Sequence, residues 1–213
     1  LELLTPVAKT YGAEMGLVSV NNGLQVLGGY GYTEDFILEQ LARDVRIMSL
    51  YEGTTGIQSL ALLGRQVIGN KGRILQHWNE EVMKDIETAR QHTNIQCYAD
   101  WLLKELVDFR NITNRMLDIG ANTNKETVLA DANLYMELFA LLNVGWQWLK
   151  QGIAAHIKLH ASNNTDDDII FYKSKLHSMK FFFHYELRKT KGLGARLTDN
   201  EVLTVMQNDD LIM

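Results

Sequence analysis

The residues best suited to chemistry lie between positions 25 and 58, where a glycine-rich turn and a lone carboxylate are separated by one amphipathic stretch. Glycine adopts backbone conformations that other residues resist, and it lets a ligand approach the main chain closely, so Gly28-Gly29 marks a sharp turn or a contact point. Glu52 precedes Gly53, and a carboxylate at such a helix break is placed as a catalytic base would be. This segment therefore predicts proton abstraction.

Each of these features also has an ordinary structural explanation. A carboxylate at a helix end is usually solvated, and paired glycines commonly end a helix. Arg43-Asp44 fits a structural ion pair that braces two helices better than a catalytic pair, and Tyr51 fits packing beside Glu52. The functional interpretation therefore depends on all the motifs occurring together.

Three helices are expected to position these residues. Residues 3–28 have apolar side chains at helical spacing and end at the paired glycines. Thr33 is suited to cap a second helix that runs to Tyr51 and turns four apolar side chains inward: Phe36, Leu41, Val45 and Met48. Thr55 and Gln58 have the spacing of a capping box for a third helix, which ends at Gly69-Asn70 and packs through Ile57, Leu60, Ala61, Gly64 and Val67.

The rest of the chain predicts four antiparallel helices joined by polar loops. The first three each have one apolar stripe. In the first helix the stripe is formed by Ile74, Trp78, Val82, Ile86 and Ala89, and in the second by Leu102, Leu106, Phe109, Ile112, Met116 and Ile119. The third helix, at 125–160, has a stripe formed by Leu129, Ala132, Met136, Phe139, Leu142, Trp146, Leu149 and Ile153. The fourth runs from the Asp166–Asp168 cluster to about Lys189, before a flexible turn at 192–194. We expect an all-α fold: an up-and-down helical bundle in residues 1–70 and a second helical bundle, an extension, in residues 71–213.

Composition narrows the functional classes. The 213 residues are 46% hydrophobic and 22% charged, as in globular proteins, and the net charge of −5 gives no reason to expect nucleic acid or an anionic membrane as partner. No apolar run approaches the ~18–20 residues that span a bilayer. The single Cys97 fits a reducing, cytoplasmic compartment. The first residues resemble neither an initiator methionine nor a signal peptide, so we expect a C-terminal fragment of a longer protein.

No metal site is expected. His156 and His160 are four residues apart and share a helix face, but no Asp or Glu completes a recognisable motif and no cysteine pair exists. The Asp166–Asp168 cluster lacks the glycine and the terminal glutamate of an EF-hand loop, so it fits the charged start of a helix.

The order and spacing of three motifs resemble the C-terminal helical domain of acyl-CoA dehydrogenases: Gln25-x-x-Gly28-Gly29-x-Gly31, Arg43-Asp44 and Tyr51-Glu52-Gly53-Thr54. This resemblance covers roughly residues 3–68. The remaining residues resemble, more loosely, the helical extension of a bacterial branch of the family related to methylthiopropanoyl-CoA dehydrogenase. In one departure, Gly56 stands where many family members carry a long polar residue that helps to bind the cofactor.

The resemblance implies an oxidoreductase of fatty acid metabolism that converts an acyl-CoA thioester into the 2,3-enoyl-CoA. It implies that Glu52 removes the α-proton, that FAD accepts the β-hydride, and that an electron-transfer flavoprotein reoxidises the FAD. Gln25, Gly28 and Gly29 match positions that contact the FAD of a neighbouring subunit, and Thr54 matches a contact to the adenosine part of its own subunit's FAD. A homo-dimer or tetramer in the bacterial cytoplasm is implied.

Two other functions remain open at this point. The protein could be similar to an acyl-CoA oxidase, in which oxygen accepts the electrons and peroxide forms. It could also be a non-catalytic helical module for oligomerisation or partner binding, in which Glu52 is a relic. The isolated fragment is expected to be inactive, because the N-terminal helical and middle β regions of the family complete the flavin site.

Overall fold

A computed structural model describes residues 1–122, 125–199, 201 and 204–205, and every regular element within them is helical, which confirms the all-α fold. The α-helices are α1 (Thr5–Leu27), α2 (Leu38–Arg46), α3 (Thr55–Leu60), α4 (Ile74–Arg90), α5 (Gln96–Asn122), α6 (Lys125–Leu129), α7 (Ala132–Leu159), α8 (Asp166–Phe181) and α9 (Thr190–Leu197). Short 3₁₀ segments cover Gly28–Tyr32, Ile47–Ser49 and Leu187–Lys189, and π-helical turns extend α3 over Ala61–Ile68 and α8 over Phe182–Glu186.

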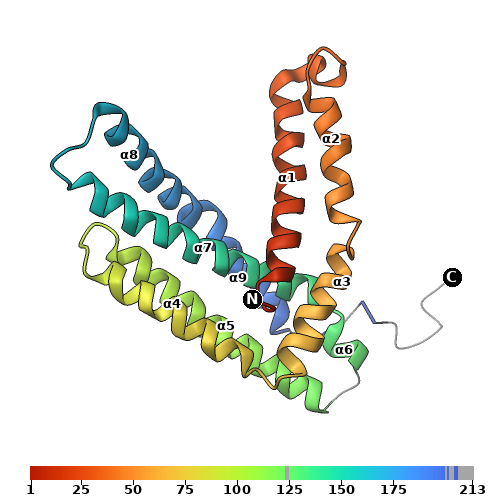
Figure 1. Cartoon of the computed structure of the whole chain (residues 1–213). Helices are drawn as coiled ribbons and strands as arrows, with labels where there is room; N and C mark the ends of the chain where they lie inside the picture. Colours follow the sequence, from red (N-terminus) through yellow and green to blue (C-terminus); the bar gives the residue numbers. More distant parts are fainter. Residues whose placement is uncertain (123–124, 200, 202–203, 206–213) are drawn as a thin grey trace.

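Helices α1 and α2 form an antiparallel hairpin, the arm, which projects from the rest of the molecule (Figure 1). Two glycines on α1 allow the helices to pack closely. A Cβ at Gly23 would lie 2.9 Å from the Leu38 side chain, and one at Gly16 would lie 3.0 Å from the Val45 side chain. The 3₁₀ segment of the paired glycines forms the tip of the arm, and α3 lies at its base.

The second helix differs from its expected form. It begins at Leu38, not after Thr33, because the Thr33 hydroxyl donates to the Tyr30 carbonyl at 2.8 Å and holds the preceding turn. The expected inward side chains are largely exposed, 43% for Phe36 and 45% for Met48. Within the described residues only α1 covers this helix, so its outer apolar face meets solvent.

The third helix begins as expected, but its buried face is different. Ile57 and Leu60 are exposed, while Val67 is fully buried as predicted. The π-helical turns from residue 61 onward change the helical repeat, so the face that meets the bundle is formed instead by Ser59, Leu62, Leu63, Gln66 and Val67.

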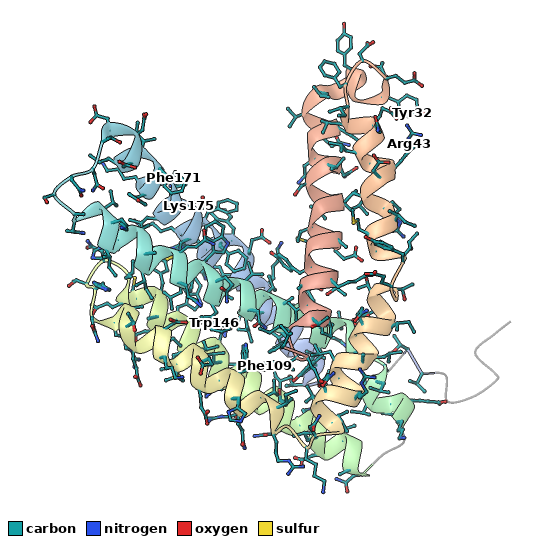
Figure 2. All side chains as sticks on the ribbon, viewed as in Figure 1. Tyr32, Arg43, Phe109, Trp146, Phe171 and Lys175 are labelled. Carbon is teal, nitrogen blue, oxygen red and sulfur yellow. The ribbon has the colours of Figure 1, made fainter. Side chains whose placement is uncertain are left out.

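Helices α4, α5, α7 and α8 lie side by side in an elongated bundle (Figure 1). Its apolar stripes are confirmed: the predicted side chains are buried, except that Ile74, Ile119 and Leu129 are partly buried. Phe109 stacks on Phe139 with ring centroids 5.4 Å apart, and the Trp146 indole donates to Asp85 at 2.6 Å; Figure 2 labels Phe109 and Trp146 in this bundle.

Two local expectations for the extension were wrong. The helix expected at 125–160 is interrupted before Ala132, so α6 and α7 are separate. The expected flexible turn at 192–194 is helical and lies in α9, because Leu197 is buried and Gly194 packs closely against Ile112 of α5.

One stretch of the described chain, Lys125–Leu159, is long and apolar enough to cross a membrane by length and composition alone. Its most apolar window is 61% buried inside the protein, where α7 contacts α4, α5 and α8. This stretch is therefore mostly core of the bundle.

Candidate active site

The predicted catalytic glutamate lies on a strained turn between α2 and α3. Glu52 has a φ of 54° and Gly53 a φ of 87°, so two consecutive residues are left-handed. A left-handed conformation costs a non-glycine residue roughly 1–2 kcal/mol, and such strain persists only where surrounding contacts impose it. The turn thus reverses the chain between the end of the α2 segment and α3 at Glu52.

Long side chains from two helices hold this turn. The Lys9 ammonium on α1 donates to the Gly53 carbonyl at 2.6 Å, and the Gln58 amide on α3 donates to the Glu52 carbonyl at 2.9 Å. Hydrogen bonds from charged groups are stronger than neutral ones. Both carbonyls of the strained pair are therefore fixed by groups outside the turn.

The start of α3 is attached to the arm as well. Thr54, not Thr55, is the N-cap: its hydroxyl accepts from the Ile57 amide at 3.4 Å. The Thr55 hydroxyl instead donates to the Glu14 carboxylate of α1 at 2.5 Å. The expected capping box at Thr55 is therefore not formed: Thr54 caps the helix, and the Thr55 hydroxyl is bound to α1.

A shallow groove of about 380 Å³ lies beside the glutamate, where the turn meets α1 and the end of α2. Its lining residues include Lys9, Gly12, Met48, Tyr51 and Glu52. Tyr51 lines the same groove as Glu52, and its hydroxyl lies 3.4 Å from the Met48 sulfur. Glu52 is exposed in this chain, so the buried site expected for a base is not formed by these residues alone.

The predicted glycine contact point lies at the tip of the arm. Gly28 has a φ of 59°, which explains why glycine is needed there. Gly29 has neither a positive φ nor any atom within 4 Å of a Cβ built on it. Gln25 is exposed on the last turn of α1 beside them. Packing within the chain therefore gives no reason for glycine at position 29, which leaves room for a ligand.

The structure separates the predicted residues into two groups. Glu52 and Thr54 lie at the base of the arm, whereas Gln25, Gly28 and Gly29 lie at its tip. Lys9 contacts the turn, and Gln25 stands sixteen residues further along α1, about 24 Å along the axis at about 1.5 Å per residue. The two groups do not form one site within a single chain.

The Arg43-Asp44 pair does not form the expected ion pair. Arg43 pairs instead with Glu39, one turn earlier on α2, at 3.1 Å. Neighbours in sequence point to different helix faces, whereas residues four apart share one. Figure 2 shows Arg43 and Tyr32 toward the tip of the arm, far from the bundle.

Histidines gather at the far end of the bundle. The rings of His92 and His156 are 4.9 Å apart and those of His156 and His160 are 4.4 Å apart. Burial, and then the charges of His160 and His92, lowers the pKa of His156. Among the described residues, no three His, Cys, Asp or Glu side chains are arranged to hold a metal ion.

Sequence reasoning did not identify the residues that fix the turn. Lys9 is 44 residues from Gly53 and Glu14 is 41 residues from Thr55, and neither belongs to a local motif. Gln58 was expected to complete a capping box with Thr55, but its amide donates to the Glu52 carbonyl instead.

Two family models match the chain. One, described as "Acyl-CoA dehydrogenase, C-terminal domain", matches residues 2–68, and the other, described as "Acetyl-CoA dehydrogenase C-terminal like", matches residues 78–207. Together they cover both the arm with the turn at Glu52 and the bundle.

Curated relatives match over most of the chain. The broad-specificity linear acyl-CoA dehydrogenase FadE5 of Mycobacterium tuberculosis is 29% identical over 98% of this chain and 34% of its own length. A butyryl-CoA dehydrogenase of Syntrophomonas wolfei is 32% identical over 83% of this chain and 29% of its own. The 3-methylmercaptopropionyl-CoA dehydrogenase of Ruegeria pomeroyi is 27% identical over 93% of this chain and 33% of its own length. The chain spans about a third of the length of these relatives.

Proposed function

The chain belongs to the acyl-CoA dehydrogenase family, and we propose that it is the C-terminal part of an FAD-dependent enzyme that oxidises an acyl-CoA thioester to the 2,3-enoyl-CoA. The observation that carries this proposal is the strained turn at Glu52 and Gly53, pinned by Lys9 and Gln58. Backbone strain maintained by remote contacts is characteristic of functional sites.

In the proposed reaction Glu52 takes a proton from the α-carbon of the thioester, and the electron pair of that C–H bond becomes the new carbon–carbon double bond. FAD, when bound beside this residue, would supply the acceptor for the hydride that leaves the β-carbon. Gly53 allows the chain to reverse directly after the base, and the pinned carbonyls limit how far its carboxylate can move. A base held in one direction loses less entropy on reaching the transition state.

The two groups of predicted cofactor residues suit two different cofactor molecules. We propose that Thr54 contacts the adenosine part of the FAD in its own subunit, and that Gln25, Gly28 and Gly29 contact the FAD of a neighbour. The distance of about 24 Å between tip and base, together with the open space at Gly29, supports this assignment. Contacts from two subunits to one FAD require a homo-dimer or tetramer, and the exposed tip of the arm is accessible to a neighbouring subunit.

The same proposal covers the domains and the partners. Residues 1–70 form the last part of the family's helical domain and residues 71–213 form its extension; the family matches to 2–68 and 78–207 support that division. The missing two thirds of the family's length must exclude water from the exposed Glu52. An electron-transfer flavoprotein is the proposed oxidant, and the single cysteine supports a reducing cytoplasmic location.

Anaerobic flavin reduction tests the proposal. The full-length protein is mixed with a panel of acyl-CoA thioesters, and bleaching of the flavin absorbance is followed for the wild type, Glu52→Gln and a control, Glu87→Gln, which removes an exposed carboxylate on α4. Bleaching in the wild type and the control, lost in Glu52→Gln with FAD still bound, is expected.

Three results would contradict parts of the proposal. Bleaching by Glu52→Gln at the wild-type rate would exclude Glu52 as the base. A protein purified without flavin would favour a non-catalytic helical module. Stoichiometric peroxide formation in air would indicate an oxidase in place of a dehydrogenase.

A further inference from the structure

The extension meets the catalytic end of the arm at the start of α7. Figure 1 shows α3 at the base of the arm beside the bundle, and α7 contacts both α1 and α3. A groove of about 360 Å³ lies at this junction, with apolar walls that include Met15, Met136 and Leu141. Thr55 of α3 and Asn133 of α7 also line it. The groove is therefore built jointly by the arm and the extension.

Asn133 of α7 lies beside Gly56, the position at which many family members carry a long polar residue. A Cβ built on Gly56 would lie 4.0 Å from the Asn133 side-chain oxygen and 3.9 Å from the Thr54 hydroxyl. Both are ordinary contact distances, and Gly56 has no positive φ, so neither strain nor crowding requires glycine there. The amide from the extension thus lies beside the space that a longer residue at position 56 would use.

The Asn133 amide is not used by the fold. Asn133 is exposed, and among the described residues its side chain makes no hydrogen bond. Its neighbours on α7, Ala132 and Met136, are each 3% exposed, and Tyr135 is fully buried. The buried neighbours hold the backbone at position 133, and the exposed amide remains available to a ligand.

The charges of the groove restrict what it can bind. Carboxylates of Glu14, Glu137 and Glu186 line it, against the single ammonium of Lys189. This negative balance disfavours the diphosphate of a dinucleotide inside the groove, whereas carboxylates and amides accept hydrogen bonds from the hydroxyls of a neutral nucleoside. A neutral group rich in hydroxyls, with a flat apolar ring against the methionines, matches this lining.

We propose that Asn133 is a further cofactor-binding residue, whose amide hydrogen-bonds the ribose or adenine of the FAD beside Thr54. The extension thereby completes the cofactor site with a polar group that Gly56 does not supply. This inference rests on the proposed function, because it takes the dinucleotide at Thr54 as its ligand. An amide provides both donors and an acceptor, so it can bind either the ribose hydroxyls or the adenine edge.

FAD affinity of the full-length protein tests the inference. FAD is titrated into the deflavinated protein, and its dissociation constant is measured from the quenching of flavin fluorescence. Asn133→Ala is expected to raise the dissociation constant about tenfold, as expected when one hydrogen bond is lost. Gln147→Ala removes an exposed amide on the same helix but away from the groove, so it should leave the dissociation constant for FAD unchanged. Adding Gly56→Gln to Asn133→Ala should recover most of the affinity.

A second variant distinguishes a lost hydrogen bond from a misfolded protein. Asn133→Asp keeps the shape of the side chain but removes its donor, and it should also weaken FAD binding. An unchanged dissociation constant in both Asn133 variants overturns the inference while the proposed function stands. A wild-type protein that binds no FAD overturns the proposed function, and this inference with it.

Discussion

The ammonium of Lys9 donates a 2.6 Å hydrogen bond to the carbonyl of Gly53, a residue 44 positions later in the chain. The contact joins the first turns of α1 to the strained turn that presents Glu52. The position of the proposed base therefore depends on a helix that contributes no residue to the predicted motif around it.

Loss of the Lys9 contact should reduce catalysis more than it reduces substrate binding. Lys9→Met removes the ammonium but keeps much of the apolar stem, so the turn should relax and kcat of the full-length enzyme should fall about tenfold, equivalent to about 1.4 kcal/mol. Steady-state kinetics measure the change, with Lys173→Met on the exposed face of α8 as control. Equal kcat values for both variants would mean that the contact does not position the base.

Substitution of Gly53 should destabilise the turn, whereas the same substitution at Gly56 should not. Gly53→Ala forces a Cβ onto a residue with a φ of 87°, 3.1 Å from the Gln58 amide nitrogen. We expect a loss of roughly 1–2 kcal/mol in the free energy of unfolding and nearly complete loss of activity. Gly56→Ala makes only ordinary contacts. Urea denaturation distinguishes the two, and equal losses would contradict the assigned strain.

Two glycines at the tip of the arm should differ in role: Gly29 should bind a ligand, and Gly31 should be needed for folding. Gly29→Ala meets no atom within 4 Å, so the free energy of unfolding should change by less than about 0.5 kcal/mol while FAD binding weakens. Gly31→Ala would place a Cβ against the Leu24 carbonyl oxygen, so it should destabilise the chain. Thermal unfolding and FAD titration give the two readouts. Unaltered FAD affinity in Gly29→Ala would remove the argument for a ligand at the tip.

The buried carboxylate of Glu105 should be the strongest polar contribution to holding α9 on the bundle. It is 3% exposed and accepts hydrogen bonds from Trp101 at 3.3 Å and Thr190 at 2.8 Å, and it lies 3.0 Å from the Lys191 ammonium. Glu105→Ala leaves the Trp101 indole without its acceptor, whereas Thr190 keeps the Leu187 carbonyl and Lys191 keeps Asp108, so the free energy of unfolding should fall by about 2 kcal/mol. Glu105→Gln should cost less than half as much. A loss below about 1 kcal/mol in Glu105→Ala, measured by urea denaturation, would contradict this role.

The histidine cluster should make stability depend on pH. The pKa of His156 is lowered by burial and then by the charges of His160 and His92, so the unfolded chain binds more protons than the folded one below the ordinary histidine pKa. Stability should therefore be complete above about pH 6.5 and fall as the pH drops toward the lowered pKa. His156→Gln should flatten this fall, as measured by Tm from pH 5 to 7.5; His77→Gln, at an exposed site, should not. Parallel Tm curves for the wild type and His156→Gln would contradict the assignment.

Local sequence determined the bundle well. The apolar residues of α4, α5 and α7 are buried at the positions that helical periodicity predicts, and Asp168 completes the capping box of Thr165. These signals depend on residues three and four positions apart, which are neighbours on any helix whatever packs against it. The choice of Glu52 and the paired glycines as site candidates followed from their motifs taken together and from the family resemblance that those motifs carry.

Tertiary structure alone decided which distant residues support the turn and which apolar faces are covered. Lys9 reaches Gly53, Asn133 reaches the space beside Gly56, and His92 joins His156 only because separate helices pack together. The outer face of α2 has the apolar pattern of a buried helix, yet the described chain covers only its α1 side. Periodicity shows that a face is apolar; because hydrophobic burial is non-directional, it does not show which partner covers that face.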